Sequence, residues 1–440
     1  MSGNEILGMV MLALMLGVIF IGFPISFTLL FLALVCGWIG LGTIVFDLAF
    51  FQTIGLMKEQ TLAAVPLFIF MGYVVEQAGL MERLFRAFQV MLAPVRGSLY
   101  LGVILTATVF AMATGIVGAA VTVLGIMAAP IMMRSGYSPR LSAGAIAAGG
   151  TLGILIPPSV MLIVMGPVIN VSVAKLYAAA FGPGLLLAGL YIVYTLARSF
   201  WNPALGPAVP KEERAASFAA VIREVVVGMV PLALLIASTL GTILAGIVTP
   251  TEAAAMGASG AIVLAIAYRK LTLARLKAAV FSTMATTSMV LFLAVASNVF
   301  GAIFARLGSA TIITNALTAL PVPPFVTLLL VMSLIFLLGW PFEWPAIIFV
   351  FIPLFYPVVA AMKYDMVWFG ALVAVNLQTA YLSPPVAMSA YYLKQVAPQW
   401  SLGTIYRGMA DFMVLQLVAL ALLVLFPEIA LWLPRWLFGD

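Results

Sequence analysis

Long apolar runs, interrupted only by single charged residues, constrain this chain more than any other feature of its sequence. Of its 440 residues, 65% are hydrophobic and only 8% are charged. A soluble domain carries about 25% charged residues, so this chain has too few charges to cover a globular surface in water. Lipid must be its main solvent, and an all-α membrane protein with many spans is the expected fold class.

The apolar runs can be measured against a bilayer core, which about 20 helical residues cross. Eight runs are long enough to be simple spans: 5–22, 25–46, 60–80, 175–197, 225–247, 250–268, 279–304 and 405–433. Two further runs, 141–170 and 366–396, each contain a Pro-Pro pair. Because proline removes an amide donor and clashes with the preceding turn, these two runs predict broken crossing helices.

Two other runs, 98–133 and 325–361, do not fit a simple span. The first breaks after a leg of residues 98–112, which as a helix would reach only about 22 Å. The second breaks between Gly339 and Glu343. We interpret both runs as re-entrant hairpins that enter the membrane and turn back.

The basic residues predict the orientation of the chain. With ten crossings, two hairpins and the N-terminus outside, fifteen of the 20 Lys and Arg residues lie on the cytoplasmic side, as the positive-inside rule requires. Both termini are then periplasmic. The hydrophilic stretch 198–224, with three prolines and the run Lys211 to Arg214, is predicted to be a cytoplasmic linker.

The second half of the sequence repeats features of the first half at a constant shift of 227 positions, which indicates an internal repeat. This shift aligns Pro130 with Pro357 and the pair Pro157-Pro158 with Pro384-Pro385, which is more than chance would give in a proline-rich chain. The stretch 134–140 after the first hairpin carries two arginines, whereas its counterpart is net neutral. The two halves are therefore predicted to have opposite orientations in the membrane.

The composition excludes most site chemistry. The chain has no histidine and a single cysteine, Cys36, so it lacks the residue clusters of transition-metal sites and the histidine of most nucleophile pairs. The basic residues occur singly, which does not suggest nucleic acid binding. We therefore expect no enzyme activity, no cofactor and no transition metal.

The two broken helices are the strongest candidates for a binding site. A Pro-Pro break frees carbonyl oxygens that suit Na⁺, and the amides of the next half-helix favour a carboxylate. For a single break a packing kink is the better explanation, but repetition of the break favours function. At the second hairpin tip, Glu343 either favours a cation or a proton or lies in a wetted outer vestibule. For Glu76 and Glu252, interface and helix-cap roles are expected.

These motifs resemble a known family. The run Gly153-Ile154-Leu155-Ile156-Pro157-Pro158-Ser159, the run Ser135-Gly136-Tyr137, and Val375 to Gln378 followed by Ser383-Pro384-Pro385 closely resemble the large membrane subunit of TRAP transporters (DctM-like). The resemblance covers nearly the whole chain.

The resemblance implies a Na⁺-driven secondary importer of the bacterial inner membrane. Such a permease takes a small organic acid, for example a C4-dicarboxylate or a sialic acid, from a periplasmic substrate-binding protein, and it works with a small four-helix (DctQ-like) membrane subunit. Its hairpins and broken helices form an elevator-type transport domain that moves against a scaffold. A stand-alone Na⁺/carboxylate symporter without a binding protein is the nearest alternative, and a channel is a third.

The domain organisation expected on this basis has five parts. They are N-terminal scaffold spans (1–59), a first inverted repeat (60–197), the cytoplasmic linker (198–224), central scaffold spans (225–278) and a second inverted repeat (279–440).

The resemblance also implies site residues. The Na⁺ ligands carried over by motif are Thr114, Gly115, Gly153, Ile156 and Pro158 in the first half, and Gly339, Thr379, Ala380 and Ser383 in the second. The residues expected to contact the solute are Gly118, Ser159, Glu343, Asn376, Pro384 and Pro385. Family members usually carry Gly-Ser at the first tip, so Thr114 is the candidate that supplies this oxygen here.

Overall fold

The computed structural model describes residues 2–208, 218–385 and 387–439, and all regular structure within these ranges is helical. Eight helices are long and apolar enough to cross a membrane, and as many as ten spans result if each of two bent helix pairs counts as one. The charged run Lys211 to Arg214 of the predicted linker lies outside the described residues. The chain is therefore an all-α membrane protein, as its composition predicts.

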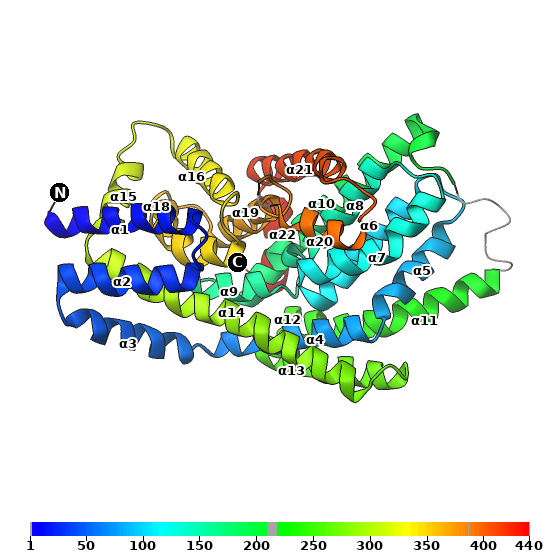
Figure 1. The fold of residues 1–440 in the computed structure, drawn as a ribbon, viewed down its shortest axis with the longest axis horizontal. Helices are drawn as coiled ribbons and strands as arrows, with labels where there is room; N and C mark the ends of the chain where they lie inside the picture. Colours follow the sequence, from blue (N-terminus) through cyan, green and yellow to red (C-terminus); the bar gives the residue numbers. More distant parts are fainter. Residues whose placement is uncertain (1, 209–217, 386, 440) are drawn as a thin grey trace.

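One group of helices packs along the lower side of the molecule in Figure 1, with the long helix α14 at its centre. Helix α14 contacts α2, α3 and α4, while α13 packs on α4 and α11 packs on α5. The bounds are α1 Gly3–Phe20, α2 Ile25–Leu41, α3 Ile44–Met57, α4 Ala64–Gln77, α5 Leu80–Leu92, α11 Phe218–Ile236, α12 Thr242–Leu244, α13 Pro250–Ala267, α14 Leu273–Arg306 and α15 Ser309–Thr318.

A second group lies above the first in Figure 1 and contains both hairpins and both Pro-Pro breaks. Its bounds are α6 Ser98–Thr114, α7 Val117–Arg134, α8 Pro139–Leu155, α9 Val160–Val168, α10 Val173–Trp201, α16 Pro324–Leu338, α17 Trp344–Ala346, α18 Ile352–Ala361, α19 Met366–Thr379, α20 Met388–Val396, α21 Leu402–Leu425 and α22 Glu428–Phe438. A π-helical turn, Ile347–Phe351, joins α17 to α18. Every residue from Leu141 to Leu155 of α8 is buried, so α8 forms the core of this group.

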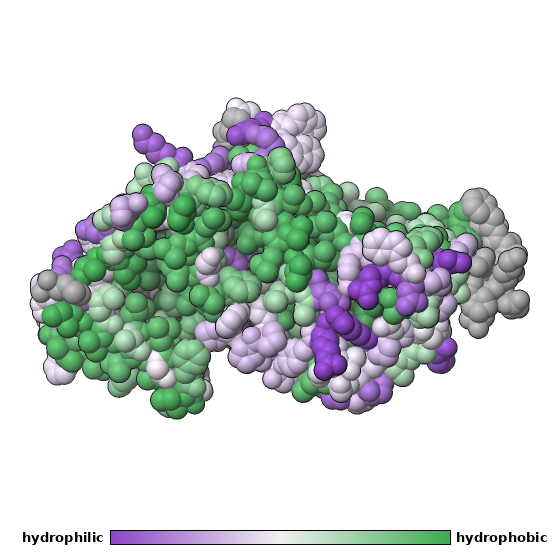
Figure 2. Space-filling view, turned by 90° about the horizontal axis from the view of Figure 1, so that it is seen from above, coloured by the Kyte–Doolittle hydropathy of each residue, from purple (hydrophilic) through white to green (hydrophobic). Residues whose placement is uncertain are grey.

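Large apolar side chains remain exposed over much of the surface. Phe27, Phe31, Trp38 and Phe50 are each more than half exposed, and Figure 2 shows a face on which apolar residues predominate over scattered hydrophilic patches. In water such a surface would drive association. It is the surface expected of a chain that is covered by lipid.

Two predicted helical runs are wrong in extent. The run 25–46 is not one helix, because α2 ends at Leu41 and Gly42 (φ 68°) reverses the chain before α3 begins at Ile44. Glycine adopts this positive φ without the steric cost that a side chain would bring. The run 405–433 also splits, since α21 ends at Leu425 and the chain turns at Pro427 into α22. Apolarity continues through both turns, so hydropathy did not reveal them.

The shift of 227 positions recurs in the helix bounds. Helix α7 covers 117–134, and the leg from α17 through α18 covers 344–361. Helix α8 begins at Pro139 and α19 begins at Met366, and both Pro-Pro bonds are cis. The two halves thus share one order of elements, while their opposite orientation in the membrane stays a prediction.

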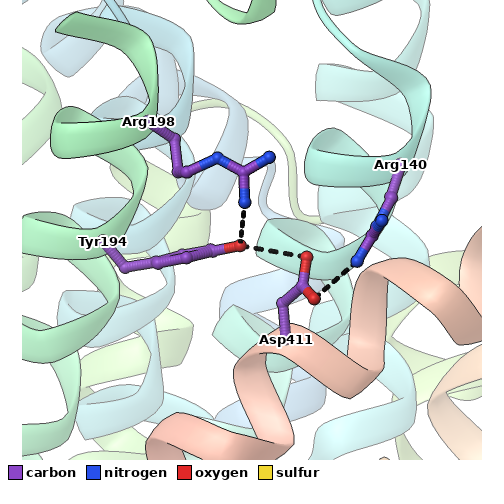
Figure 3. Close-up of polar contacts among 4 residues, drawn as sticks. All are labelled: Arg140, Tyr194, Arg198 and Asp411. Atoms are coloured by element: carbon purple, nitrogen blue, oxygen red, sulfur yellow. Dashed lines mark hydrogen bonds and ion pairs between the residues drawn. The ribbon is translucent and has the colours of Figure 1, made fainter. Parts of the chain in front are cut away.

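A charged network joins three helices of the second group at one end (Figure 3). Arg140 of α8 donates from Nη2 to Oδ1 of Asp411 on α21 at 2.6 Å. The hydroxyl of Tyr194 on α10 donates to the other carboxylate oxygen at 2.9 Å and accepts from Arg198 at 3.0 Å. Asp411 is therefore shared by two helices and ties both to α21.

Replacing Gly408 by alanine should destabilise the crossing of α8 and α21. A methyl group on Gly408 would lie 2.1 Å from the carbonyl oxygen of Arg140, and one on Gly144 would lie 2.5 Å from that of Gly408. Overpacking against backbone costs about 1–3 kcal/mol, so the thermal unfolding midpoint of Gly408→Ala in detergent should fall. Gly189→Ala on α10 is the control, because no atom lies within 4 Å of its added methyl. Equal midpoints for the two variants would contradict the prediction.

Candidate functional site

The first hairpin tip lies against the first Pro-Pro break. Helix α6 ends at Thr114, and Gly115 follows in the left-handed conformation, with φ 62°. A methyl group on Gly115 would lie 3.3 Å from the carbonyl oxygen of Pro158 and 3.7 Å from that of Gly153. Only glycine allows this approach without strain. The structure therefore brings three of the predicted Na⁺ residues together.

The other two predicted residues of the first half are placed differently. The hydroxyl of Thr114 donates to the carbonyl of Phe110 in its own helix at 3.2 Å, and the Thr114 backbone packs against Gly72 of α4. Ile156 caps α8 in an extended conformation, and its side chain packs on Gly184 of α10. The Thr114 hydroxyl therefore bonds to its own helix and not to the break.

The second half repeats the arrangement. A methyl group on Gly339, at the end of α16, would lie 3.1 Å from Cβ of Ala380. The hydroxyl of Thr379 donates to the carbonyl of Asn376, and the hydroxyl of Ser383 donates to the carbonyl of Thr379, both at 2.6 Å. Gly339, Ala380, Thr379 and Ser383 thus surround one broken helix end. The donor set is neutral oxygen, which suits a hard monovalent cation.

A cavity of about 650 Å³ opens beside both hairpin tips. Ile69 and Tyr73 of α4, with Thr286 and Met289 of α14, line one side. The hairpins, the α8–α9 break and helix α20 line the other side. The cavity therefore lies between the two groups of helices, where a solute could touch both.

The lining of this cavity is aromatic and acidic. Tyr73, Tyr381, Tyr392 and Trp344 supply rings, while Glu76 and Glu343 are its charged side chains among the described residues. Glu343 is exposed to the cavity. These groups can hold a polar solute by hydrogen bonds and ring contacts.

The predicted solute contacts divide into two sets. Gly118 and Glu343 line the cavity. Ser159 is fully buried and donates to the carbonyl of Ile154, and buried Asn376 donates to the carbonyl of Met332 at 2.7 Å. These two bonds support the broken helices. Pro384 and Pro385 are exposed and are not part of the described lining.

Several residues that line the cavity were not predicted from the sequence. The hydroxyl of Tyr73 lies 2.9 Å from that of Thr286, which joins α4 to α14 at the cavity wall. Tyr392 packs on Gly118, because a methyl group there would lie 3.0 Å from the tyrosine ring. The sequence feature that could have indicated these cavity residues is a polar side chain inside an apolar run. The sequence did not indicate which of them face one another.

A buried polar cluster connects the two repeats behind the site. Thr151 donates to Gln378 at 3.2 Å, and these two residues are 227 positions apart, so they are equivalent positions of the repeat. Gln416 of α21 donates to both at 3.4 and 3.5 Å. All three side chains have no exposed area. Thr151 and Gln378 stand at the ends of α8 and α19, so the cluster links the two broken helices directly.

Thr151→Val and Gln378→Leu should show energetic coupling in a double-mutant cycle of unfolding. Each removes the shared hydrogen bond while preserving apolar volume, and a coupling of about 0.5–1.5 kcal/mol is expected. Thr53→Val on α3 serves as the control partner for Thr151→Val, since its hydroxyl bonds only within its own helix. That control pair should be additive, and additivity in the test pair would contradict the coupling.

Two helical hairpins and two broken helices around a cavity, within a helical membrane fold, are the architecture of a membrane transport protein. Residues 10–429 match the family described as "Tripartite ATP-independent periplasmic transporter, DctM component". The chain therefore belongs to this family and is a TRAP transporter large permease, not an enzyme.

Known relatives agree with this assignment. The chain is 31% identical to the C4-dicarboxylate TRAP transporter large permease protein DctM of Pseudomonas aeruginosa, over 86% of this chain and 87% of the relative. It is also 31% identical to the sialic acid TRAP transporter large permease protein SiaM of Vibrio cholerae, over 96% and 97%. The solved YdaH transporter of Alcanivorax borkumensis has a similar fold, with a TM-score of 0.65 at 17% identity over 92% and 96% of the two chains.

Proposed function

We propose that this permease drives uptake of a small organic acid across the bacterial inner membrane with a Na⁺ gradient. The observation that carries the proposal is the convergence of hairpin tips and broken-helix carbonyls beside the 650 Å³ cavity. The backbone oxygens around Gly115 and Ala380 offer two neutral oxygen sites, one in each half. Filling both with Na⁺ would stabilise the loop conformations that form the cavity wall, so ion binding and solute binding would be coupled.

An elevator mechanism accounts for the position of the cavity. One wall belongs to α4 and α14, and the other belongs to the hairpins, the α8–α9 break and α20. If the second group of helices moves as a unit past the first, the solute crosses the membrane while the helices of both cavity walls keep their structure. The charged network around Asp411 and the cluster around Gln378 tie helices of the second group together, which supports its movement as a unit.

The partners and the solute follow from family membership. TRAP large permeases work in tripartite systems, so we propose a small membrane subunit and a periplasmic substrate-binding protein as partners. The relatives named for C4-dicarboxylate and sialic acid make a carboxylate the proposed solute class. The bias of basic residues supports a periplasmic position for both termini.

Uptake into proteoliposomes tests the proposal. The permease would be reconstituted with its small subunit and its binding protein, which is first screened against C4-dicarboxylates and sialic acids by thermal shift. Saturable uptake that needs an inward Na⁺ gradient, and that K⁺ cannot replace, is the expected result. Uptake without Na⁺ would exclude Na⁺ coupling, and uptake without the binding protein would favour a stand-alone symporter.

Gly115→Ala should weaken Na⁺ activation. The added methyl would crowd the carbonyl oxygens of Pro158 and Gly153, so the Na⁺ concentration for half-maximal uptake should rise about tenfold, equivalent to about 1.4 kcal/mol. Gly136→Ala is the matched control, because Gly136 also has positive φ (72°) but no atom lies within 4 Å of its added methyl. Unchanged Na⁺ activation in folded Gly115→Ala protein would refute this site.

Gly72→Val should block movement between the two helix groups. A methyl group on Gly72 would already lie 2.9 Å from the carbonyl oxygen of Thr114 at the first hairpin tip. Overpacking by about 1–3 kcal/mol at a sliding contact corresponds to an uptake rate roughly ten- to a hundredfold lower. Gly301→Val, whose surroundings are open, should transport normally. Wild-type rates for Gly72→Val would mean that this contact does not move.

A further inference from the structure

A second large cavity, of about 720 Å³, lies where α5, α11 and the start of α14 meet below the end of α4. Its lining is charged rather than aromatic. Five basic side chains converge on it from three segments far apart in the chain: Arg83, Arg86, Arg223, Lys270 and Arg275. Three carboxylates, Glu76, Glu82 and Glu224, share the lining. Among the described lining residues, the basic side chains thus outnumber the carboxylates by two.

The basic side chains of this cavity are not neutralised by the carboxylates. Among the described residues, none of the five takes part in an ion pair. Arg83 stacks over the ring of Tyr268 at 4.4 Å, and Arg275 donates to the carbonyl of Lys270 at 3.1 Å. These contacts position the two guanidinium groups without an ion pair. Because the basic residues of the described lining outnumber its carboxylates, an anion that joined them would lower their mutual repulsion.

The surroundings of the cavity are those of a membrane interface. Helix α5 buries Leu84 and Phe85 while Glu82 and Arg86 are exposed, as in a helix that lies along the bilayer surface. A small apolar recess of about 10 Å³ between α4, α13 and α14 adjoins the cavity and shares Gln77, Lys270 and Arg275 with it. This recess is too small for an acyl chain, so the match is between the basic cavity and a lipid headgroup whose acyl chains stay in the bilayer.

We propose that this cavity binds the phosphate headgroup of an anionic phospholipid from the cytoplasmic leaflet. Guanidinium groups bind phosphate oxygens by charge-assisted, often bidentate hydrogen bonds, and basic pockets between membrane helices on the cytoplasmic side suit such headgroups. The lipid would join α5 and α11 to the α13–α14 loop and hold this part of the scaffold together. The leaflet assignment rests on the orientation given under the proposed function.

The carboxylate of a departing solute is the competing occupant. Glu76 lines both this cavity and the central one, so the two cavities adjoin. A free anion needs no phospholipid, so the two occupants are distinguished by whether inorganic phosphate or succinate alone stabilises the chain.

Lipid binding can be measured on the purified full-length chain without any transport assay. Dioleoylphosphatidylglycerol and dioleoylphosphatidylcholine would be titrated in a neutral detergent, with bound lipid counted by native mass spectrometry and the unfolding midpoint recorded. Wild-type protein should bind phosphatidylglycerol at least tenfold more tightly than phosphatidylcholine and unfold several degrees higher with it. Failure of Na⁺-driven uptake would leave this result unaffected, so the two proposals fail separately.

The matched variants are Arg86→Gln/Arg223→Gln and Arg134→Gln/Arg407→Gln. The first pair removes two cavity charges that form no hydrogen bond or ion pair within the described part of the chain, so folding should be preserved, and it should abolish the preference for phosphatidylglycerol. The second pair removes two exposed basic residues elsewhere and should keep that preference. Arg83→Gln/Arg275→Gln provides an independent test of the same cavity.

Three results would overturn the proposal. The first is equal affinity of the wild-type chain for both lipids. The second is loss of preference in the Arg134→Gln/Arg407→Gln control to the same extent as in the cavity variants. The third is equal stabilisation by millimolar inorganic phosphate or succinate in the absence of phospholipid, which would make the cavity a site for free anions.

Discussion

Backbone hydrogen bonding in lipid is the constraint on which the rest of this structure depends. A peptide group that lacks an internal partner at membrane depth costs several kcal/mol, so irregular backbone survives only where protein or a water-filled cavity covers it. Here the irregular segments are gathered in one place, because the tips at Gly115 and Gly339 lie against the broken ends at Gly153 and Ala380. The cost of four interrupted helices is thereby confined to one place, where the freed carbonyl oxygens are available to the Na⁺ that we propose.

The repeat explains why the site has two similar halves that are not identical. Thr151 and Gln378 meet although they are 227 positions apart, which is the contact expected when equivalent helices approach a shared local axis. One repeat carries a threonine at this position and the other a glutamine, so a hydroxyl can bond to an amide. Two threonines would leave Gln416 with fewer hydrogen-bond partners. A local departure from the repeat therefore serves the buried cluster that joins the two broken helices.

Charge is scarce in this chain, and its placement divides by role. Arg140 and Asp411 pair at one end of the second helix group (Figure 3), whereas the basic residues around Arg83 and Arg275 form no ion pair among the described residues. The central cavity holds carboxylates and aromatic rings instead. The few charged residues of the sequence are thus found in three different settings: an ion pair between helices, a basic cavity and the central cavity.

The sequence by itself determined the solvent, the fold class, the two hairpins, the two Pro-Pro breaks and the family. These depend on composition and on local backbone chemistry, which any reader of the chain can see. It also named Gly115, Gly153 and Pro158, because glycine and proline act on the backbone where they stand. Only the tertiary structure decided that Ser159 and Asn376 support the broken helices while Tyr73, Tyr392 and Thr286 line the cavity. In an apolar chain nearly every face is compatible with burial, so hydropathy cannot tell a side chain that faces a cavity from one that faces a helix. That choice is made by packing between residues hundreds of positions apart.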